Sequence, residues 1–124
     1  MRFLLFVFLL FWIDVFAGAQ IRFAFLTDLH VVPNNPNEAV LKQVVAEINQ
    51  DEYDFVVITG DLSNMGSDAE LLCVKAILDE LQHPYYIIPG NHETNWSESA
   101  GMTFNRLWGA DRFNFTVGDY RFLG

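Results

Sequence analysis

The sequence has few cysteines and few cations, and each scarcity narrows what the chain can be. Cys73 is the only cysteine, so no disulfide can form within the chain, and its apolar helical surroundings predict a small buried side chain. Seven Lys and Arg stand against 16 Asp and Glu, which gives a formal net charge of −9. Nucleic acids bind mainly to cations that neutralise their phosphates, so the charge argues against nucleic acid as the primary partner.

Internal repeats, low-complexity runs and linkers are also missing from residue 20 onward. A typical single domain has roughly 100 to 200 residues, so the 124 residues of this chain predict one domain or part of one. Two complete domains are excluded. The first nineteen residues raise the apolar share of the chain to 52%, and the rest of the chain is best considered without them.

Residues 1–19 have the composition of a targeting segment. One Arg precedes the uninterrupted apolar run Phe3–Ile13, and Asp14 and the small residues Ala17-Gly18-Ala19 follow it. A membrane-spanning helix needs about 20 apolar residues, so this run is too short for a stable membrane anchor. The pattern predicts a secretory signal peptide cut after Ala19, and therefore export to the periplasm or the cell exterior. A buried core helix or an uncleaved anchor is the alternative.

Strand and helix patterns alternate after this segment. Apolar runs at 21–27, 55–59 and 85–88 predict strands that are buried on both faces. Between them, Asn35-Pro36-Asn37-Glu38 and Ser67-Asp68-Ala69-Glu70 are N-terminal capping sequences for helices that run to about Gln50 and Leu81. The order strand, helix, strand, helix, strand predicts a parallel sheet with right-handed crossovers.

The last third of the chain predicts one helix and a hairpin. The helix is expected over about 97–107, and two strands at 112–117 and 120–123 flank the turn Gly118-Asp119. Because the last strand stops at Gly124, the sheet would keep exposed edges. We therefore expect residues 20–124 to be the N-terminal part of a larger α/β domain. Four aromatic residues of this region could pack in the core or line a substrate cleft: Trp96, Phe104, Trp108 and Phe113.

Three polar clusters interrupt the apolar pattern, each directly after a predicted strand. They are Asp28-Leu29-His30, Gly60-Asp61 and Gly90-Asn91-His92-Glu93. The carboxyl ends of parallel strands lie along one edge of a sheet, where ligands bind. The glycines at 60 and 90 are expected to let the backbone bend sharply before each cluster.

The side chains of these clusters suit a divalent metal. Two Asp carboxylates close together repel each other, and a bound cation removes that conflict. Oxygen donors mixed with imidazole nitrogen fit Mn, Fe or Zn better than Ca.

These three motifs, in this order, resemble the first three sequence blocks of the calcineurin-like metallophosphoesterases. The resemblance implies a four-layer α/β sandwich, of which this chain would hold the N-terminal β-α-β-α-β half and the start of the following strands. It also implies two divalent metal ions. Asp28 and His30 would bind the first ion, Asp61 would bridge both, and Asn91 would bind the second. His92 would be a catalytic imidazole that contacts the phosphoryl group and assists the leaving group.

The implied function is metal-dependent hydrolysis of a small-molecule phosphoester. In a two-metal mechanism, ions about 3.5 to 4 Å apart lower the pKa of a bridging water, and the resulting hydroxide attacks phosphorus. The later family blocks, including a Gly-His-x-His motif, are absent, and the remaining histidine, His83, is expected at a helix end rather than in the site.

Because each ion would lack some of its protein ligands, we expect the 124-residue chain by itself to be inactive and poorly folded. One alternative is a noncatalytic exported binding module or an inert truncated fragment of the family. A mononuclear metal hydrolase of unrelated fold is another.

Overall fold

The computed structural model describes residues 20–124, and the predicted signal peptide over 1–19 lies outside the described residues. Within this part of the chain, no helix has the length and apolar character needed to cross a membrane. The elements, in chain order, are β1 (Phe23–Leu26), α1 (Pro36–Ile48), β2 (Phe55–Thr59), α2 (Asp68–Leu78), β3 (Tyr85–Ile88), α3 (Asn91–Thr94), α4 (Met102–Trp108), β4 (Asn114–Val117) and β5 (Tyr120–Leu123).

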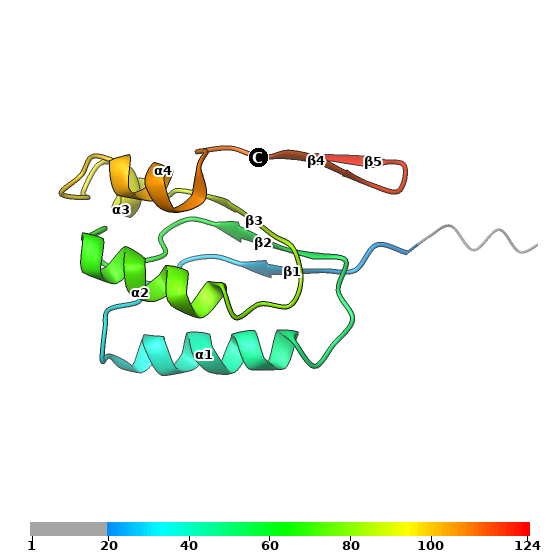
Figure 1. The fold of residues 1–124 in the computed structure, drawn as a ribbon, viewed down its shortest axis with the longest axis horizontal. Coiled ribbons are helices and arrows are strands. Elements are labelled where there is room, and N and C mark those ends of the chain that lie inside the picture. The colour runs from blue at the N-terminus through cyan, green and yellow to red at the C-terminus, as the bar shows by residue number, and fades with distance from the viewer. Residues whose placement is uncertain (1–19) are drawn as a thin grey trace, which may run out of the picture.

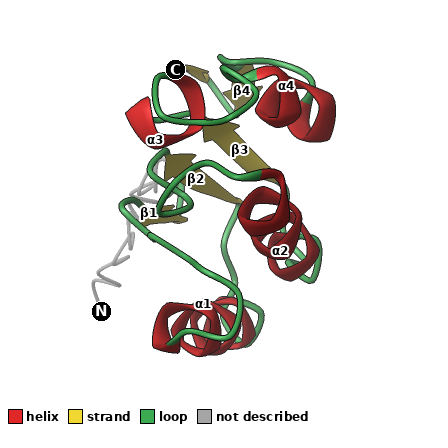
Figure 2. Cartoon of the chain, turned by 90° about the vertical axis from the view of Figure 1, so that its left-hand side faces the viewer, coloured by secondary structure: helices red, strands yellow, loops and turns green. Residues whose placement is uncertain are grey.

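The centre of the fold is a three-stranded parallel sheet with the order β1-β2-β3. Phe23 pairs with Phe55 across β1 and β2, and Val56 pairs with Tyr85 across β2 and β3. Each crossover contains one helix, and α1 and α2 both lie on the same side of the sheet (Figures 1 and 2). The predicted parallel α/β arrangement is confirmed.

Both long helices begin at the predicted capping residues. The Asn35 side chain accepts a hydrogen bond from the Glu38 N–H at 3.1 Å, with Pro36 at the first helical position. Ser67 and Glu70 form a complete capping box at the start of α2. Each cap satisfies N–H groups that have no partner within the helix, which stabilises a helix by about 1 kcal/mol.

The apolar core lies between the sheet and its helices. Val56 and Ile58 are fully buried and point toward the helices, because alternate residues of a strand face opposite sides. Leu41 of α1, Val74 of α2 and Phe104 of α4 belong to the same cluster. Cys73 lies partly buried at the border of this core, and burial raises the pKa of its thiol.

The other face of the sheet is only partly covered. The hairpin formed by β4 and β5 places the rings of Phe115 and Phe122 at 5.0 and 4.8 Å from the ring of Phe55, which is 1% exposed. Phe23 and Phe25 of β1 remain 45% and 57% exposed. The prediction that this strand is buried on both faces is therefore wrong for β1 among the described residues: the hairpin touches Phe23 only through the edge of the Phe122 ring, at a centroid distance of 6.3 Å, and leaves Phe25 largely exposed.

The helix expected over about 97–107 is present, but its predicted start is wrong. A short helix, α3, occupies 91–94, and α4 begins only at Met102. Gly101 has a φ of 85°, a left-handed conformation that a continuous helix does not contain. Strand β1 is shorter than predicted and β4 begins two residues later, whereas β2, β3, β5 and the hairpin turn match their predicted positions.

Candidate metal centre

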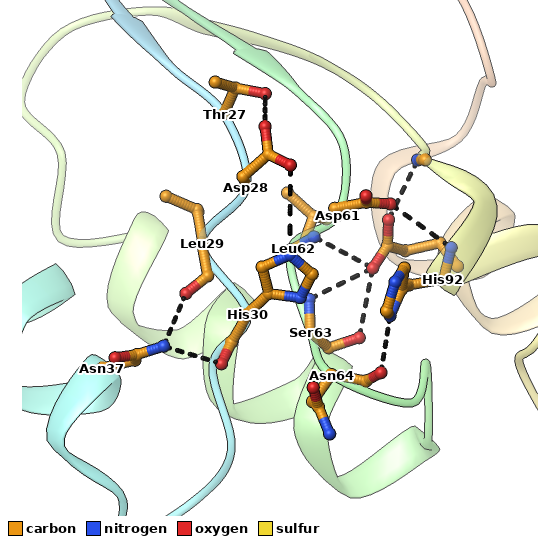
Figure 3. A network of polar contacts seen from close by, with 12 residues as sticks. Thr27, Asp28, Leu29, His30, Asn37, Asp61, Leu62, Ser63, Asn64 and His92 are labelled. Carbon is orange, nitrogen blue, oxygen red and sulfur yellow. Dashed lines mark hydrogen bonds and ion pairs between the residues drawn. The ribbon is translucent and has the colours of Figure 1, made fainter.

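The segments that follow β1 and β2 continue side by side past the ends of these strands. The N–H groups of Asp28, His30 and Val31 donate to the carbonyls of residues 60, 61 and 62 at 3.2, 3.0 and 3.0 Å. The parallel register of the sheet is thus carried into the polar motifs. Figure 3 shows Asp28, His30, Asp61 and His92 converging at this edge.

The backbone at three of these residues adopts an unusual conformation. Asp28, His30 and Asp61 have φ values of 54°, 46° and 48°. The left-handed region is uncommon for residues other than glycine, and such strain costs roughly 1 to 3 kcal/mol per residue. Three residues with a strained backbone at one sheet edge indicate that the positions of their side chains are maintained despite the strain. Such strain is typical of functional sites.

Gly60 and Gly90 allow the loops after β2 and β3 to touch. A Cβ atom on Gly60 would lie 2.3 Å from the Gly90 nitrogen, and one on Gly90 would lie 2.1 Å from Oδ1 of Asp61. Gly60 also has a φ of 80°, as expected for a sharp bend. Gly90 has a φ of −94°, so the predicted bend is wrong for this glycine, and close approach is the reason that it has no side chain.

Potential metal-binding atoms lie close together at this edge. One donor atom each from His30, Asp61 and His92 all fall within 4.8 Å of one another. Oδ1 of Asp28 lies 3.9 Å from Nε2 of His30, while Oδ2 of Asp28 accepts a hydrogen bond from the Thr27 hydroxyl at 2.6 Å. Carboxylate oxygen and imidazole nitrogen together fit a first-row divalent ion.

Asn91 is the remaining predicted ligand. It is exposed at the first position of α3, directly before His92 in the chain. Its backbone carbonyl accepts the N–H groups of Asn95 and Trp96, which fixes the short helix that carries it.

The His92 ring is held in one orientation. It is 9% exposed, and its Nδ1 lies 2.5 Å from the carbonyl oxygen of Asn64. A carbonyl oxygen only accepts hydrogen bonds, so Nδ1 carries a proton, and Nε2 is the nitrogen left for chemistry. The ring packs against His30 and Trp96 with centroid distances of 4.8 and 4.2 Å.

Glu93 is a member of the site whose role the sequence did not reveal. It is fully buried, and its carboxylate accepts hydrogen bonds from Leu62, Ser63 and Gly90. Its place at the end of the Gly-Asn-His-Glu motif is the one sequence signal that could have pointed to it.

His83 lies outside the candidate metal centre, as predicted. His83 contacts the carbonyl oxygen of Ile48 at 3.2 Å, before the start of β3 and away from the carboxyl edge. Of the four aromatic residues with open roles, Phe104 is a core residue at 1% exposure. Trp96 instead borders the site, 58% exposed beside His92.

The fold and this edge define an α/β protein with a candidate metal centre at the carboxyl ends of a parallel sheet. The family model for calcineurin-like phosphoesterases matches residues 21–123. The chain therefore belongs to the calcineurin-like phosphoesterase family, as its motifs predicted. The family uses divalent metal ions, which agrees with the His and Asp side chains gathered here.

Curated relatives are named as phosphodiesterases. A probable cyclic nucleotide phosphodiesterase of Vesicomyosocius okutanii subsp. Calyptogena okutanii is 28% identical over 103 residues, which are 79% of this chain and 42% of the relative. One of Rhodopseudomonas palustris is 33% identical, covering 58% of this chain and 29% of the relative. A glycerophosphodiester phosphodiesterase of Enterobacter lignolyticus is 36% identical, covering 40% and 19%. The chain thus spans less than half the length of these relatives.

Proposed function

We propose that the protein is a metal-dependent phosphodiesterase that hydrolyses a small-molecule phosphodiester. The observation that carries the proposal is the convergence of His30, Asp61 and His92 within 4.8 Å, with Asp28 beside them. The relatives named above act on cyclic nucleotides or glycerophosphodiesters, both of which are phosphodiesters. Their names support this substrate class for our chain.

The proposed metal ligands are those that the motifs predict. Asp28 and His30 would hold one divalent ion of the Mn, Fe or Zn class, Asp61 would be shared, and Asn91 would hold a second. When bound, two such ions neutralise phosphate oxygens and make a water molecule more acidic. The Thr27 hydroxyl donates a hydrogen bond that orients the Asp28 carboxylate. The backbone N–H of His92 donates to Oδ1 of Asp61 at 3.4 Å.

His92 acts on the substrate rather than on the metal in this proposal. Its Nδ1 proton is fixed on the Asn64 carbonyl, so Nε2 is the atom that faces a phosphoryl group. Protonated at Nε2, the imidazolium stabilises charge on the phosphoryl oxygens and donates a proton to the leaving oxygen. The neighbouring rings of His30 and Trp96 restrict its rotation.

Exchange of His92 in the full-length protein tests the proposal. His92→Ala should keep its bound metal but lose about 10²- to 10⁴-fold in kcat, the usual contribution of a general acid. The assay is Mn²⁺-dependent hydrolysis of an aryl phosphodiester, with metal content measured in parallel. His83→Ala is the matched control, because His83 lies away from the edge, and its turnover should equal that of the wild type. Unchanged turnover in His92→Ala would remove this residue from the mechanism.

The 124-residue chain should not catalyse the reaction by itself. Two four-coordinate ions need about eight donors, and Asp28, His30, Asp61 and Asn91 supply about five with Asp61 counted twice. We propose that further ligands are required for turnover and that the chain alone is also marginally folded, since Phe25 stays exposed. Mn²⁺-dependent hydrolysis of an aryl phosphodiester by the purified 124-residue chain would refute this part of the proposal.

We also propose that the protein is exported and that residues 1–19 are removed after Ala19. The support is the cationic start, apolar core and small-residue end of this segment. N-terminal sequencing of the protein recovered outside the cytoplasm should begin at Gln20. A protein that retains Met1 in the cytoplasmic fraction contradicts this proposal.

A further inference from the structure

Glu93 is a buried carboxylate that the chemistry above does not use. Its side chain is 0% exposed. Oε1 accepts hydrogen bonds from the Leu62 N–H at 3.0 Å and from both the N–H and the hydroxyl of Ser63 at 3.1 Å. Oε2 accepts the Gly90 N–H at 2.9 Å. Within the described residues, the partners of Glu93 are therefore neutral donors, three of which belong to the backbone.

These donors come from two different loops. Leu62 and Ser63 directly follow Asp61, whereas Gly90 directly precedes Asn91 and His92. Burial of a charged group is costly unless hydrogen bonds compensate it, so the carboxylate is stable here only while both loops stay in place. Glu93 thus links the loop that carries Asp61 to the loop that carries His92.

The loop that carries Asp61 and the loop that carries His92 also contact each other directly at these two residues. The backbone N–H of His92 donates to Oδ1 of Asp61, and the ring Nδ1–H of His92 donates to the carbonyl of Asn64. Ser63 couples these contacts to the carboxylate, because its hydroxyl donates to Glu93 and accepts the N–H of Gly66 at 3.0 Å. A shift of either loop would change the distance from Asp61 to His92 and the direction of Nε2.

We propose that Glu93 is a positioning residue for the metal centre. Its carboxylate sets the separation of Asp61 and His92 and keeps the His92 ring on the Asn64 carbonyl, without contact to metal or substrate. This inference rests on the proposed function for its catalytic meaning, but the geometric claim concerns the chain's own residues.

The variant Glu93→Gln tests the carboxylate without emptying its site. Glutamine has nearly the same shape, but one acceptor oxygen becomes an NH₂ donor. If the NH₂ takes the place of Oε2, it meets the Gly90 N–H. If it takes the place of Oε1, it meets the N–H groups of Leu62 and Ser63. The first case removes the cap at the start of α3, and the second breaks the contacts between the two loops, while the core between the sheet and its helices is untouched.

Glu70→Gln is the matched control. Glu70 is 6% exposed, and its Oε2 accepts the N–H groups of Met65 and Ser67 at 3.0 and 3.1 Å. It therefore also offers a buried carboxylate to loop N–H groups, but it caps α2 instead of joining the two ligand loops. If neutralising any buried carboxylate weakened metal binding, the loss of metal affinity should appear in both variants.

The experiment measures Co²⁺ affinity by absorption titration in the full-length protein, well below the melting temperature of each variant. Loss of a residue that orients metal ligands typically weakens metal affinity 10- to 100-fold. We expect a loss of about 10-fold or more in Glu93→Gln, with kcat reduced and KM within about twofold. Glu70→Gln should bind Co²⁺ as the wild type does. In metal-free protein, NMR should show the Nδ1–H tautomer of His92 in the wild type and in Glu70→Gln, but a tautomer mixture in Glu93→Gln.

Wild-type Co²⁺ affinity in folded Glu93→Gln, or equal losses in both variants, would overturn the proposal. Should Glu93→Gln fail to fold, Ser63→Ala removes one of the three bonds to Oε1 and should give a smaller affinity loss of about threefold; unchanged affinity there would also overturn it. A wild type that binds Co²⁺ but hydrolyses no phosphodiester would refute the proposed function, and the affinity ratio would still decide the role of Glu93.

Discussion

Asp28, His30 and Asp61 share a left-handed backbone, with φ values between 46° and 54°. Each residue would relax if glycine replaced it, because glycine adopts positive φ without a steric penalty. The chain keeps side chains at these positions although they strain the backbone. At the residue scale, the strained backbone of the site lowers the stability of the protein but places the carboxylate and imidazole groups.

This strain predicts an unusual effect for Asp28→Gly. In metal-free protein, the free energy of unfolding should stay the same or rise by up to about 1 kcal/mol, because strain is relieved at an exposed residue. Metal affinity should fall in the same variant. Urea denaturation in the presence of EDTA and Mn²⁺ titration provide the two readouts.

Ala39→Gly in α1 is the control for this prediction, since an exposed glycine within a helix costs about 1 kcal/mol. If Asp28→Gly destabilises the protein as much as Ala39→Gly does, the backbone at Asp28 is not strained.

The gathering of polar side chains could be predicted from the sequence, but not their support. Asp28, His30, Asp61 and His92 follow strands of a parallel sheet, whose carboxyl ends lie along one edge, and the structure brings them together there. The role of Glu93 depends on which N–H groups lie around it, and those come from residues about 30 positions earlier in the chain. No local pattern contains that information.

At the scale of elements, the starts of helices were the most predictable features. Asn35 and Ser67 begin α1 and α2 because their side chains accept the N–H of the residue three positions later, an interaction within one short segment. The region from 91 to 108 was less predictable. Helix α4 begins only after the left-handed residues Ala100 and Gly101, whose conformation the sequence alone does not specify.

The capping box of α2 predicts a stability change that concerns this element. Ser67→Ala should lower the free energy of unfolding by about 1 kcal/mol, because the N–H of Glu70 loses its acceptor. Ser67→Asp should retain wild-type stability, since aspartate caps helices equally well. Urea denaturation of both variants measures the difference, and an alanine variant as stable as the aspartate variant would contradict the role of this cap.

At the scale of the whole molecule, the two faces of the sheet differ. The face covered by α1 and α2 is a closed core, whereas the opposite face is shielded by the hairpin around Phe55 and stays open at Phe25, which is 57% exposed. The parallel order of the strands could be predicted from the alternation of patterns. The position of the hairpin could not, because it depends on ring contacts such as that between Phe55 and Phe122.

The parallel sheet is also what creates the candidate centre. It brings together motifs that are separated by about 30 residues in the chain, because β1, β2 and β3 all end at the same edge. In the proposed centre, this edge binds two divalent ions and Asp61 is shared between them.

The number of Mn²⁺ ions bound per full-length protein measures this stoichiometry. Equilibrium dialysis of metal-free protein should give two ions per molecule for the wild type and fewer than one for Asp61→Asn at the same free Mn²⁺ concentration, because each ion loses a charged ligand. Asp54→Asn, at the opposite end of β2, is the control and should bind two. One ion in the wild type, or two in Asp61→Asn, would refute a two-ion centre that shares Asp61.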